Sequence, residues 1–385
     1  MMTDRQAPKA SGKAGSFEPP KTSKNDRHGN NSSKKREEPS RHGSMRVDKR
    51  VLNRLVKLAK TRERSLILTH DNPDPDAMAA AAGMAFLYEQ FADLKDSVLS
   101  YGGIIGRAEN RALVRHLKLP MIPFSRLKIE DFDLVTLVDT QHAAGNHSLP
   151  MSRTPDVVID HHPLRTGNHG PALRLVSASH GSTSSIVTAL IRMAGLEPNP
   201  PLATALFYGV KSDTRSLGRD SIPADTEVYR WLFQLSDQTL LSQIEHPQVP
   251  ISYFQAYHTA FERARVFRNV VMVYLGTVYT PDIVPEIAER LLSLEHARWS
   301  VAAGVWEGEL FVSVRTNDRR RNAGRQIMEL TRDLGGSAGG HGSMAGARIP
   351  LDGHGIEAKR LGDEILSRFR RSLGVDKTRG EPIIE

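Results

Sequence analysis

Apolar and polar residues follow one another between residues 46 and 245 in a pattern that predicts alternating helices and strands. Residues 51–59 place apolar groups at helical spacing, and residues 65–69 (SLILT) form an apolar run typical of a buried strand. A short polar turn follows, and residues 76–91 then have the composition of a helix. Strand, turn and helix predict the beginning of a βαβ unit, in which the turn lies at the carboxyl end of the strand.

The same pattern recurs further along the chain. Residues 133–140 (DLVTLVDT) and 156–163 (DVVIDHHP) contain nearly continuous apolar runs, as expected for strands that a parallel sheet buries on both faces. Each run ends in acidic or imidazole groups. Residues 184–193 predict a helix, whereas residues 203–210 fit either a strand or the end of a helix. We therefore predict one α/β domain over residues 46–245, built on a doubly wound, mainly parallel sheet.

A second, smaller α/β domain is predicted over residues 261–376, after a proline-bearing linker at 246–260. Strands are expected at 270–276, 299–304 and 309–316, and helices at 282–294, 323–334 and 355–373. Residues 335–347 (GGSAGGHGSMAGA) predict a glycine-rich loop. Residues 377–385 are expected to form a flexible tail.

Charge is concentrated at one end of the chain. The formal net charge is +8, and the first 50 residues alone contribute +7, from thirteen Lys or Arg and six Asp or Glu. Residues 1–45 contain few large apolar groups and should be disordered. Such a tail either keeps the protein in solution or acts as an arm that contacts RNA or another polyanion. The sequence leaves both interpretations open.

Composition also excludes several classes of site. The chain of 385 residues has no cysteine, which rules out disulfides, zinc–thiolate sites and cysteine nucleophiles. No apolar run approaches the roughly 18 residues that a membrane span needs, and the N-terminus has no apolar signal segment. We expect a cytoplasmic protein without membrane contact, and we leave a homodimer open.

The predicted strand ends and the turns beside them are rich in metal-ligating side chains. These residues are His70, Asp74, Asp76, Asp139, Asp160, His161, His162 and Asp213. Any single acid here could be only a helix cap, Asp76 included. Together, however, carboxylates and imidazoles without thiolates suit manganese, magnesium or a similar divalent ion. Their number exceeds the needs of one ion and favours a pair that shares a carboxylate and a water, as in two-metal phosphoryl chemistry.

Two features of the second domain could bind phosphate. His341, between Gly340 and Gly342, lies in a stretch that could form either an anion-binding nest or a plain flexible turn. Arg315 could contact a phosphate through both arms of its guanidinium group, or could be an ordinary surface arginine.

These motifs, taken in order, resemble those of a known family. THDNPDPDA, LVDT, IDHHP and SDT are similar to the four metal-binding motifs of the DHH phosphoesterase superfamily. GGHGSMAGA resembles the glycine–histidine motif of its DHH-associated C-terminal domain. The resemblance covers about residues 50–375 and is strongest to the branch of RecJ-like enzymes that degrade nanoRNA and dephosphorylate 3′-phosphoadenosine 5′-phosphate. It implies two domains with the active site in the cleft between them.

The resemblance also implies a role for each motif residue. One Mn²⁺ would be held by His70, Asp74 and Asp139, and the other by Asp76, Asp139, His161 and Asp213, with Mg²⁺ or Co²⁺ as alternative ions. His162 would face the substrate phosphate, and Asp160 would orient a neighbouring histidine. The terminal phosphate or a base of the substrate would be received by Arg315, Gly339, Gly340, His341 and Gly342.

The expected function is that of a manganese-dependent phosphodiesterase or exoribonuclease that degrades nanoRNA and dinucleotides to 5′-mononucleotides. Activity on 3′-phosphoadenosine 5′-phosphate is part of that expectation. A cyclic dinucleotide phosphodiesterase and a non-catalytic nucleotide-binding module are the alternatives. Pro75, where the family usually has glycine, and Arg215, which follows the SDT motif, depart from the family pattern. Substrate length, base preference, the choice between RNA and DNA, and the polarity of digestion cannot be predicted from the sequence.

Overall fold

The computed structural model describes residues 47–165, 170–218, 221–318, 320–351 and 358–384. The predicted disordered tail, residues 1–45, lies outside these ranges. Among the described residues, no helix is both long enough and apolar enough to cross a membrane.

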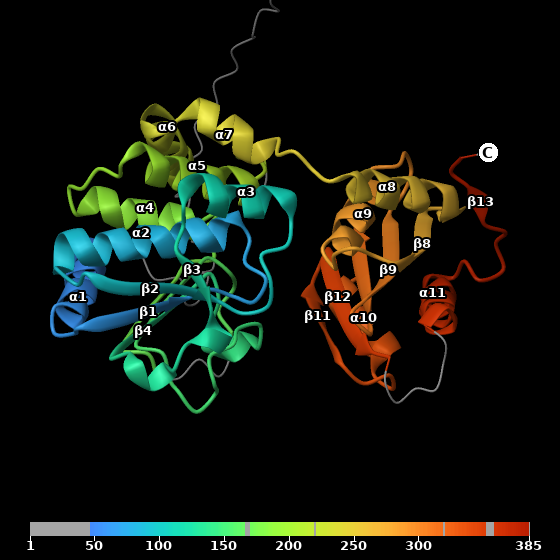
Figure 1. Ribbon diagram of the computed structural model, residues 1–385, viewed down its shortest axis with the longest axis horizontal. Coiled ribbons are helices and arrows are strands. Elements are labelled where there is room, and N and C mark those ends of the chain that lie inside the picture. The colour runs from blue at the N-terminus through green and yellow to red at the C-terminus, as the bar shows by residue number, and fades with distance from the viewer. Residues whose placement is uncertain (1–46, 166–169, 219–220, 319, 352–357, 385) are drawn as a thin grey trace, which may run out of the picture. The chain divides into compact units, whose positions relative to one another are not determined.

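The first domain is built on a six-stranded sheet in the order β3-β2-β1-β4-β5-β6, and every neighbouring pair is parallel (Figure 1). Its strands are β1 Arg64–Leu68, β2 Asp96–Tyr101, β3 Met121–Pro123, β4 Leu134–Val138, β5 Val157–Asp160 and β6 Leu173–Val176. Its helices are α1 Lys49–Ala59, α2 Pro75–Ala92, α3 Ala108–Leu117, α4 Thr183–Met193, α5 Pro200–Asp213, α6 Pro223–Leu235 and α7 Gln238–Glu245. The prediction of a parallel α/β domain is confirmed.

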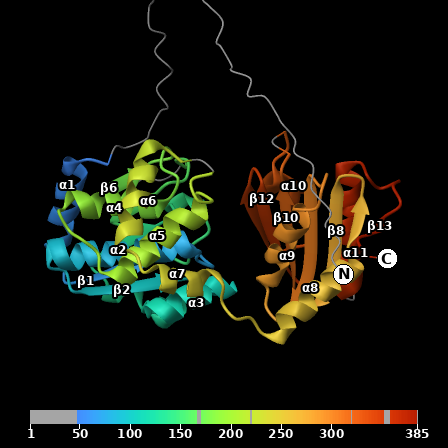
Figure 2. The ribbon, with the colours of Figure 1, turned by 90° about the horizontal axis from the view of Figure 1, so that it is seen from above.

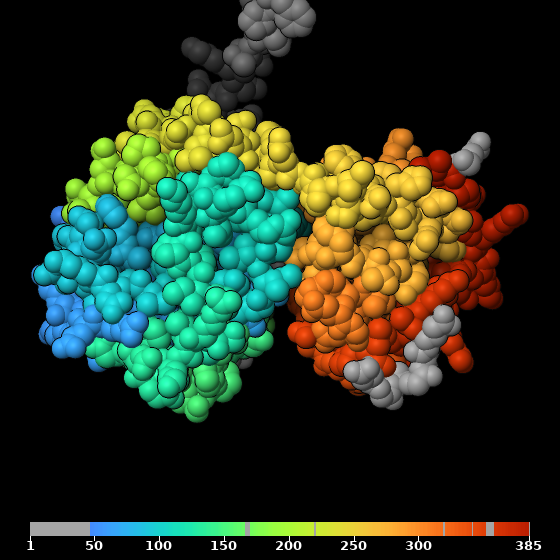
Figure 3. All heavy atoms as spheres, viewed as in Figure 1, coloured from blue at the N-terminus to red at the C-terminus, as the bar shows by residue number. Residues whose placement is uncertain are grey.

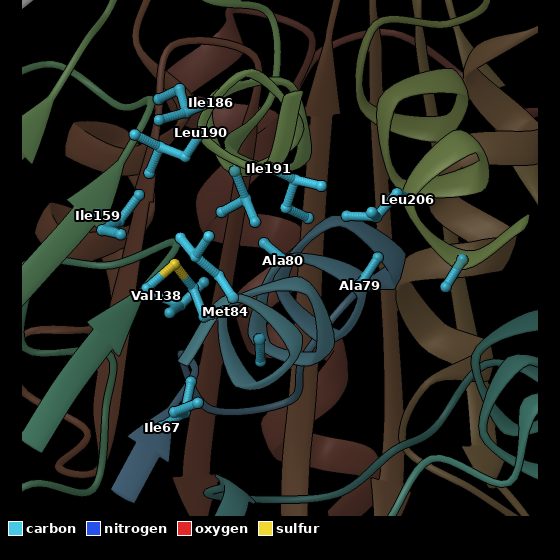
Figure 4. Packing of buried hydrophobic residues seen from close by; sticks show 14 of the residues in the cluster. Ile67, Ala79, Ala80, Met84, Val138, Ile159, Ile186, Leu190, Ile191 and Leu206 are labelled. Carbon is cyan, nitrogen blue, oxygen red and sulfur yellow. The ribbon is translucent and has the colours of Figure 1, made fainter. Parts of the chain in front are cut away.

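The two faces of this sheet bury different cores. Ile67 of β1 and Val138 of β4 point toward α2, where Met84 packs between the strands and α4 (Figure 4). Leu66 and Leu137, which alternate with them along the strands, belong to a smaller core on the opposite face. That second face is covered partly by the 3₁₀ turns Phe124–Arg126 and Ile129–Asp131. Alternation along each strand therefore explains why the strands are apolar at nearly every position.

Helix α2 begins within the first acidic motif, directly after Asp74. The side chain of Asp74 caps the helix by accepting a hydrogen bond from the Ala77 amide at 3.0 Å. Pro75 occupies the first turn, where no intrahelical partner for its nitrogen is needed and its fixed φ suits a helix. The departure at Pro75 is thus compatible with the fold of this turn.

The second domain has a seven-stranded sheet in the order β11-β12-β10-β9-β8-β7-β13, with helices on both faces (Figure 2). Its strands are β7 Arg265–Phe267, β8 Val270–Thr277, β9 Trp299–Trp306, β10 Glu309–Thr316, β11 Ser337–His341, β12 Met344–Pro350 and β13 Glu381–Pro382. Its helices are α8 Ile251–Arg263, α9 Ile283–Leu292, α10 Ala323–Thr331 and α11 Ala358–Leu373. Helices α10 and α11 pack on one core, and α8 and α9 pack on the other. The predicted smaller α/β domain is confirmed.

Three segments differ from the sequence predictions, and at residues 203–210 the structure adopts the helix, one of the two alternatives. Residues 203–210 belong to helix α5, so Asp213 ends a helix and not a strand. The predicted glycine-rich loop forms a β-hairpin of β11 and β12. Its glycines have no side chains, but their backbone groups still pair between the strands. Part of the predicted linker forms α8, whose Ala260 is buried in the second domain. Glu381–Pro382 in the predicted tail pairs with β7 as β13, and the C-terminal residues, drawn in red, cover one edge of this domain (Figure 3).

Close packing of α2 on its neighbours provides a test of the first core. A Cβ added at Gly83 would lie 2.7 Å from Val187 Cγ1. We predict that Gly83→Val lowers the free energy of unfolding by about 1–3 kcal/mol through overpacking, measured by urea denaturation. Gln90→Val on the exposed side of the same helix is the control for the helix propensity of valine and should cost less than about 1 kcal/mol. Equal losses in both variants would contradict the packing argument.

Candidate metal centre

The candidate site lies at the carboxyl ends of β1, β4 and β5, which are neighbours in the sheet although distant in the sequence. From β1 the chain adds strands first on one side, as β2 and β3, and then on the other, as β4 to β6. In parallel α/β sheets a ligand crevice forms at such a reversal point. The predicted metal-ligating residues follow these strands, except Asp213, which ends α5.

Asp139 occupies the centre of the site. It follows β4 with a positive φ of 60°, a conformation that non-glycine residues adopt rarely and that clusters at functional sites. Its side chain is only 2% exposed. One oxygen, Oδ2, lies 3.5 Å from His70 Nε2, and the other, Oδ1, lies 3.6 Å from His161 Nε2. The two oxygens of this carboxylate therefore face two different groups of side chains.

The first group consists of His70, Asp74 and Asp139, whose potential ligand atoms all lie within 4.8 Å of one another. His70 Nδ1 is 2.9 Å from the carbonyl oxygen of Asp71, which can only accept a hydrogen bond. The proton of the neutral ring is therefore held on Nδ1, and the lone pair of Nε2 is directed toward the two carboxylates. This is the usual arrangement of a metal-binding histidine. Burial opposes protonation of His70, but the two carboxylates outweigh it and raise its pKa.

The second group consists of Asp76, His161 and Asp213, again with ligand atoms within 4.8 Å of one another. His161 Nε2 lies 3.1 Å from Asp213 Oδ2. Burial and the negative charges of Asp139 and Asp213 raise the pKa of Asp76 well above its usual value. The structure thus brings these six residues into two neighbouring groups, and Asp139 of the first group lies 3.6 Å from His161 of the second. Their assignment to two bound cations stays a prediction.

Helix α4 supports this group in a way that the sequence analysis missed. The backbone amides of Thr183 and Ser184 donate hydrogen bonds of 2.7 and 2.8 Å to the two carboxylate oxygens of Asp76. The Thr183 hydroxyl donates to Asp139 Oδ1 at 2.6 Å. Asp76 therefore lies at the positive end of the helix dipole, which favours its charged form. The run GSTSS at residues 181–185 was the available signal, but it resembles an ordinary helix start, and Ser182 is indeed the N-cap.

His162 and Asp160 form a pair beside the two groups. His162 Nδ1 lies 2.8 Å from Asp160 Oδ1, so Asp160 orients His162, as expected of a carboxylate that positions a neighbouring histidine. Asp160 is 1% exposed and accepts a second hydrogen bond from the side chain of Gln141 at 2.5 Å. Burial disfavours the charged ring of His162, but the hydrogen bond to Asp160 and the nearby carboxylates outweigh it and raise its pKa to about 9. Sequence reasoning did not identify Gln141, because an isolated glutamine carries no motif.

The donor set fits divalent cations. It offers carboxylate oxygens and imidazole nitrogens, the ligands that suit manganese and magnesium, and it contains no thiolate. His70 donates to the Asp71 carbonyl oxygen, while Asp139 and Asp76 accept from the Thr183 hydroxyl and the Ser184 amide. These outer hydrogen bonds fix the orientation of the three ligand side chains. A cation would also reduce the repulsion between the buried carboxylates, which the hydrogen bonds alone offset only in part.

Of the predicted substrate-binding residues, Arg315 lies on β10, Gly339, Gly340 and His341 lie on β11, and Gly342 lies in the turn that follows β11. Strands β10 and β11 flank β12. Arg315 of β10 and His341 of β11 both stand opposite Met344 in register. Burial lowers the pKa of Arg315 to about 10, and its Nη1 donates to Ser313 Oγ at 2.8 Å. The side chain of His341 lies outside the described parts of the structure. The placement of the active site between the two domains stays a prediction.

The three predicted glycines of this hairpin differ in their surroundings. Gly340 has a φ of 145°, and a Cβ there would lie 2.4 Å from the Met344 carbonyl oxygen, so only glycine fits. Gly339 and Gly342 have open space where a Cβ would be. Backbone at these two positions can therefore be approached closely by a ligand.

Comparison with known proteins identifies the same two domains that the sequence motifs resemble. Residues 64–210 match the profile of the DHH family, N-terminal domain, and residues 268–371 match that of the DHHA1 domain. The chain is 33% identical over 304 residues to the uncharacterised protein MJ1633 of Methanocaldococcus jannaschii. This alignment covers 77% of the present chain and 61% of MJ1633. The chain is also 28% identical over 177 residues to the A-adding tRNA nucleotidyltransferase of Geobacter sulfurreducens. That alignment covers 44% of the present chain and 19% of the enzyme. The chain thus spans less than two thirds of the length of either relative.

One solved structure resembles the fold over most of the chain. An exopolyphosphatase-related protein from Bacteroides fragilis superposes with a TM-score of 0.67 at 15% identity, covering 85% of this chain and 96% of that one. RecJ of Thermus thermophilus, crystallised with Mn²⁺, gives a TM-score of 0.49 at 13% identity, covering 84% of this chain and 55% of that one. At this identity the likeness to the Bacteroides fragilis protein shows the fold alone.

The role of Thr183 can be tested with an isosteric pair in one helix. Thr183→Val removes the hydrogen bond to Asp139 and keeps the volume of the side chain. We predict that it weakens Mn²⁺ binding about 10- to 100-fold, the usual effect of losing such a partner, measured by isothermal titration calorimetry. Thr188→Val is the control, because the buried Thr188 hydroxyl has no hydrogen-bond partner among the described residues. A Thr183→Val variant that binds Mn²⁺ like the control would refute this role.

The His162–Asp160 pair predicts a pH dependence of stability in protein kept free of metal with EDTA. The pKa of His162 in the folded protein, about 9, exceeds its usual value of 6.5. Its stabilising effect is therefore fully present below pH 6.5 and is lost as the pH rises through 9. We predict that Asp160→Asn lowers the pKa of His162, measured by NMR, and removes this contribution from urea denaturation between pH 6 and pH 10. A stability difference between the two proteins that is constant over this range would contradict the assignment.

Proposed function

Because this chain belongs to the DHH family and carries a DHHA1 domain, we propose that it is a divalent-cation-dependent phosphodiesterase. Its proposed substrates are very short oligonucleotides, which it degrades to 5′-mononucleotides, and 3′-phosphoadenosine 5′-phosphate. The observation that supports this most directly is the position of Asp139, whose two oxygens face two separate groups of ligand atoms. A carboxylate shared between two cations is a common feature of two-metal hydrolases.

In this proposal one cation is held by His70, Asp74 and Asp139, and the other by Asp76, Asp139, His161 and Asp213. Mn²⁺ is the proposed ion, with Mg²⁺ and Co²⁺ as alternatives. Bound cations would supply Lewis-acid polarisation of the phosphoryl group and would acidify the attacking water. The rigid support from α4 keeps the carboxylates in place, so little reorganisation is needed during the reaction.

We propose that His162 is the side chain that donates a proton to the leaving group during the reaction. Asp160 holds its Nδ1, which leaves Nε2 available for a proton that can pass to the leaving 3′-oxygen. The side chain of His162 is 45% exposed, unlike that of His161 at 14%, so a substrate can reach it. This difference in exposure supports the separate roles of the two adjacent histidines.

The second domain is proposed to bind the far end of the substrate through Arg315, His341 and the backbone of Gly339, Gly340 and Gly342. Arg315 is held by Ser313 and by the Val314 carbonyl oxygen, which would limit the entropy lost on phosphate binding. A site that holds both ends of its substrate favours short molecules. This is the reason for proposing dinucleotides and nanoRNA over long strands.

A non-catalytic nucleotide-binding module is the alternative from another class. It would not need two complete ligand groups around one carboxylate, whereas all six proposed ligand positions carry a carboxylate or an imidazole. A cyclic dinucleotide would use the same groups and differs only in how it fits the second domain. Both alternatives are included in the assay below.

We predict that the protein with Mn²⁺ cleaves end-labelled 2-mers to 5-mers faster than 24-mers. The panel should also contain 3′-phosphoadenosine 5′-phosphate, pyrophosphate and a cyclic dinucleotide, and Mg²⁺ and Co²⁺ should be compared with Mn²⁺. Asp139→Asn should lower turnover by at least about 1,000-fold, because several kcal/mol of cation stabilisation are lost. Products are resolved by electrophoresis or chromatography.

Asp93→Asn is the matched control for this assay. Asp93 is exposed at the end of α2 with a φ of 58°, a conformation that asparagine also tolerates. Turnover of the control should equal that of the unchanged protein. Absence of turnover with every substrate and cation would refute the enzymatic proposal, and faster cleavage of 24-mers would refute the preference for short substrates.

A further inference from the structure

The second domain contains a groove that the proposed function does not use. It has a volume of about 1020 Å³ and is bounded by β7, β8 and the α11 helix. Within the described ranges, its lining includes the cationic residues Arg263, Arg265, Lys359 and Arg370, and one carboxylate, that of Asp363. Arg315 and the glycine-rich hairpin are not part of it. The groove is therefore a separate site with an excess of positive charge.

The cations of the groove are not neutralised by carboxylates. Among the described residues, none of the four forms an ion pair, although ion pairs are common elsewhere in the chain. Three of them are instead tied to backbone carbonyl oxygens. Arg265 Nη1 donates to the Ala264 carbonyl at 2.9 Å, and Arg370 Nη2 donates to that of Asp376 at 2.8 Å. The guanidinium groups are thus positioned while they retain their charge.

Most of the remaining lining is apolar or aromatic, and Thr277 and Ser367 are its polar members. Phe267, Met272, Tyr274 and Leu366 belong to or pack on the core beneath the groove. The guanidinium group of Arg370 lies 4.4 Å from the ring centroid of Phe267. Phe267 and Met272 are buried, whereas Tyr274 and Leu366 are partly exposed. Cationic side chains beside a partly exposed aromatic ring are the combination by which proteins hold single-stranded nucleic acid, since phosphates contact the cations and a base stacks on the ring.

Close packing of α11 against β8 shapes the groove. A Cβ at Gly362 would lie 2.5 Å from the ring of Tyr274, so glycine is needed for the helix to approach this strand. On the strand, the pairing of β8 with β9 is irregular between Tyr274 and Thr277, and Gly276 there has a φ of 76°. Arg263 Nη1 lies beside this irregular segment, 3.4 Å from the Leu275 carbonyl oxygen. The strand irregularity thus lies beside one of the cations that line the groove.

We propose that this groove binds the sugar–phosphate backbone of a single-stranded oligonucleotide. Charge complementarity favours a polyanion and argues against the basic N-terminal segment of this chain, which has the same sign as the groove. Guanidinium groups match phosphate better than an ammonium group does, and three of the four cations are arginines. The proposal goes beyond the proposed function, because it concerns binding at another site and does not require hydrolysis.

The test uses the full chain in EDTA, so that binding is measured without hydrolysis. Fluorescence anisotropy gives the Kd of a labelled, unstructured 24-nucleotide RNA between 50 and 300 mM salt. The groove variant combines Arg263→Gln, Arg265→Gln and Lys359→Gln. The control variant combines Arg332→Gln, Arg360→Gln and Arg371→Gln, which are exposed positions of the same domain outside the groove. Both variants lose the same charge, and Arg370 is kept because it supports Phe267.

We expect the groove variant to bind at least about 10-fold more weakly, with a log–log salt slope smaller by about 2, since each phosphate contact of a single strand contributes about 0.7. The control should change the Kd less than about 2-fold. Ultraviolet cross-linking of the unchanged protein, followed by peptide mapping, should label residues 263–277 or 358–370. This second measurement stands even if the groove variant folds poorly.

Three results would overturn the proposal. The first is an equal loss of affinity in the two variants, and the second is cross-linking confined to other segments. The third is competition by poly-glutamate as effective as unlabelled RNA at equal charge, which would indicate a general anion-binding surface. Loss of turnover in the hydrolysis assay has no bearing on these readouts, so failure of the proposed function and failure of this proposal are distinguishable.

Discussion

The burial of several carboxylates at one edge of a parallel sheet is the constraint on which the rest of the first domain depends. Asp76, Asp139 and Asp160 are each no more than 2% exposed, and an unpaired charge in such a position would be very costly. Each is therefore supplied with donors from another element: α4 for Asp76 and Asp139, and Gln141 with His162 for Asp160. Burial, together with the negative charges of Asp139 and Asp213, raises the pKa of Asp76 despite these donors. A pair of divalent cations is the compensation that we propose.

The sheet order makes this concentration of charge possible. Strands β1, β4 and β5 are adjacent, so the residues that follow them meet at one edge although some 90 positions separate His70 from His162. Helix α5 then contributes Asp213 from outside the sheet. The fold by itself would be compatible with many reactions. What narrows the choice is the chemistry of the side chains at this edge, with imidazole and carboxylate groups around the shared Asp139.

Much of this arrangement could be predicted from the sequence, because strands buried on both faces leave a clear apolar signature, as in β4 and β5. Strand β2 was not predicted, because half of the residues in Asp96–Tyr101 are polar and the strand lies next to the edge strand β3. The β11–β12 hairpin was taken for a loop because glycine has no side chain whose alternation could reveal a strand. Thr183 escaped notice for a different reason. Its backbone amide bonds a residue 107 positions away and its hydroxyl bonds a residue 44 positions away, and no local sequence pattern encodes such contacts.

The contacts of Thr183 also imply that the two ligand groups cannot behave independently. Its amide holds Asp76 of the second group, its hydroxyl holds Asp139, and Asp139 faces the first group through its other oxygen. A cation bound by His70, Asp74 and Asp139 would fix the Asp139 carboxylate and so lower the entropy cost of ordering the second group. By linkage, occupation of the second group would strengthen the first by the same factor. In our proposal the N-terminus of α4 is therefore the mechanical connection between the two cations, and its rigidity sets how strongly they are coupled.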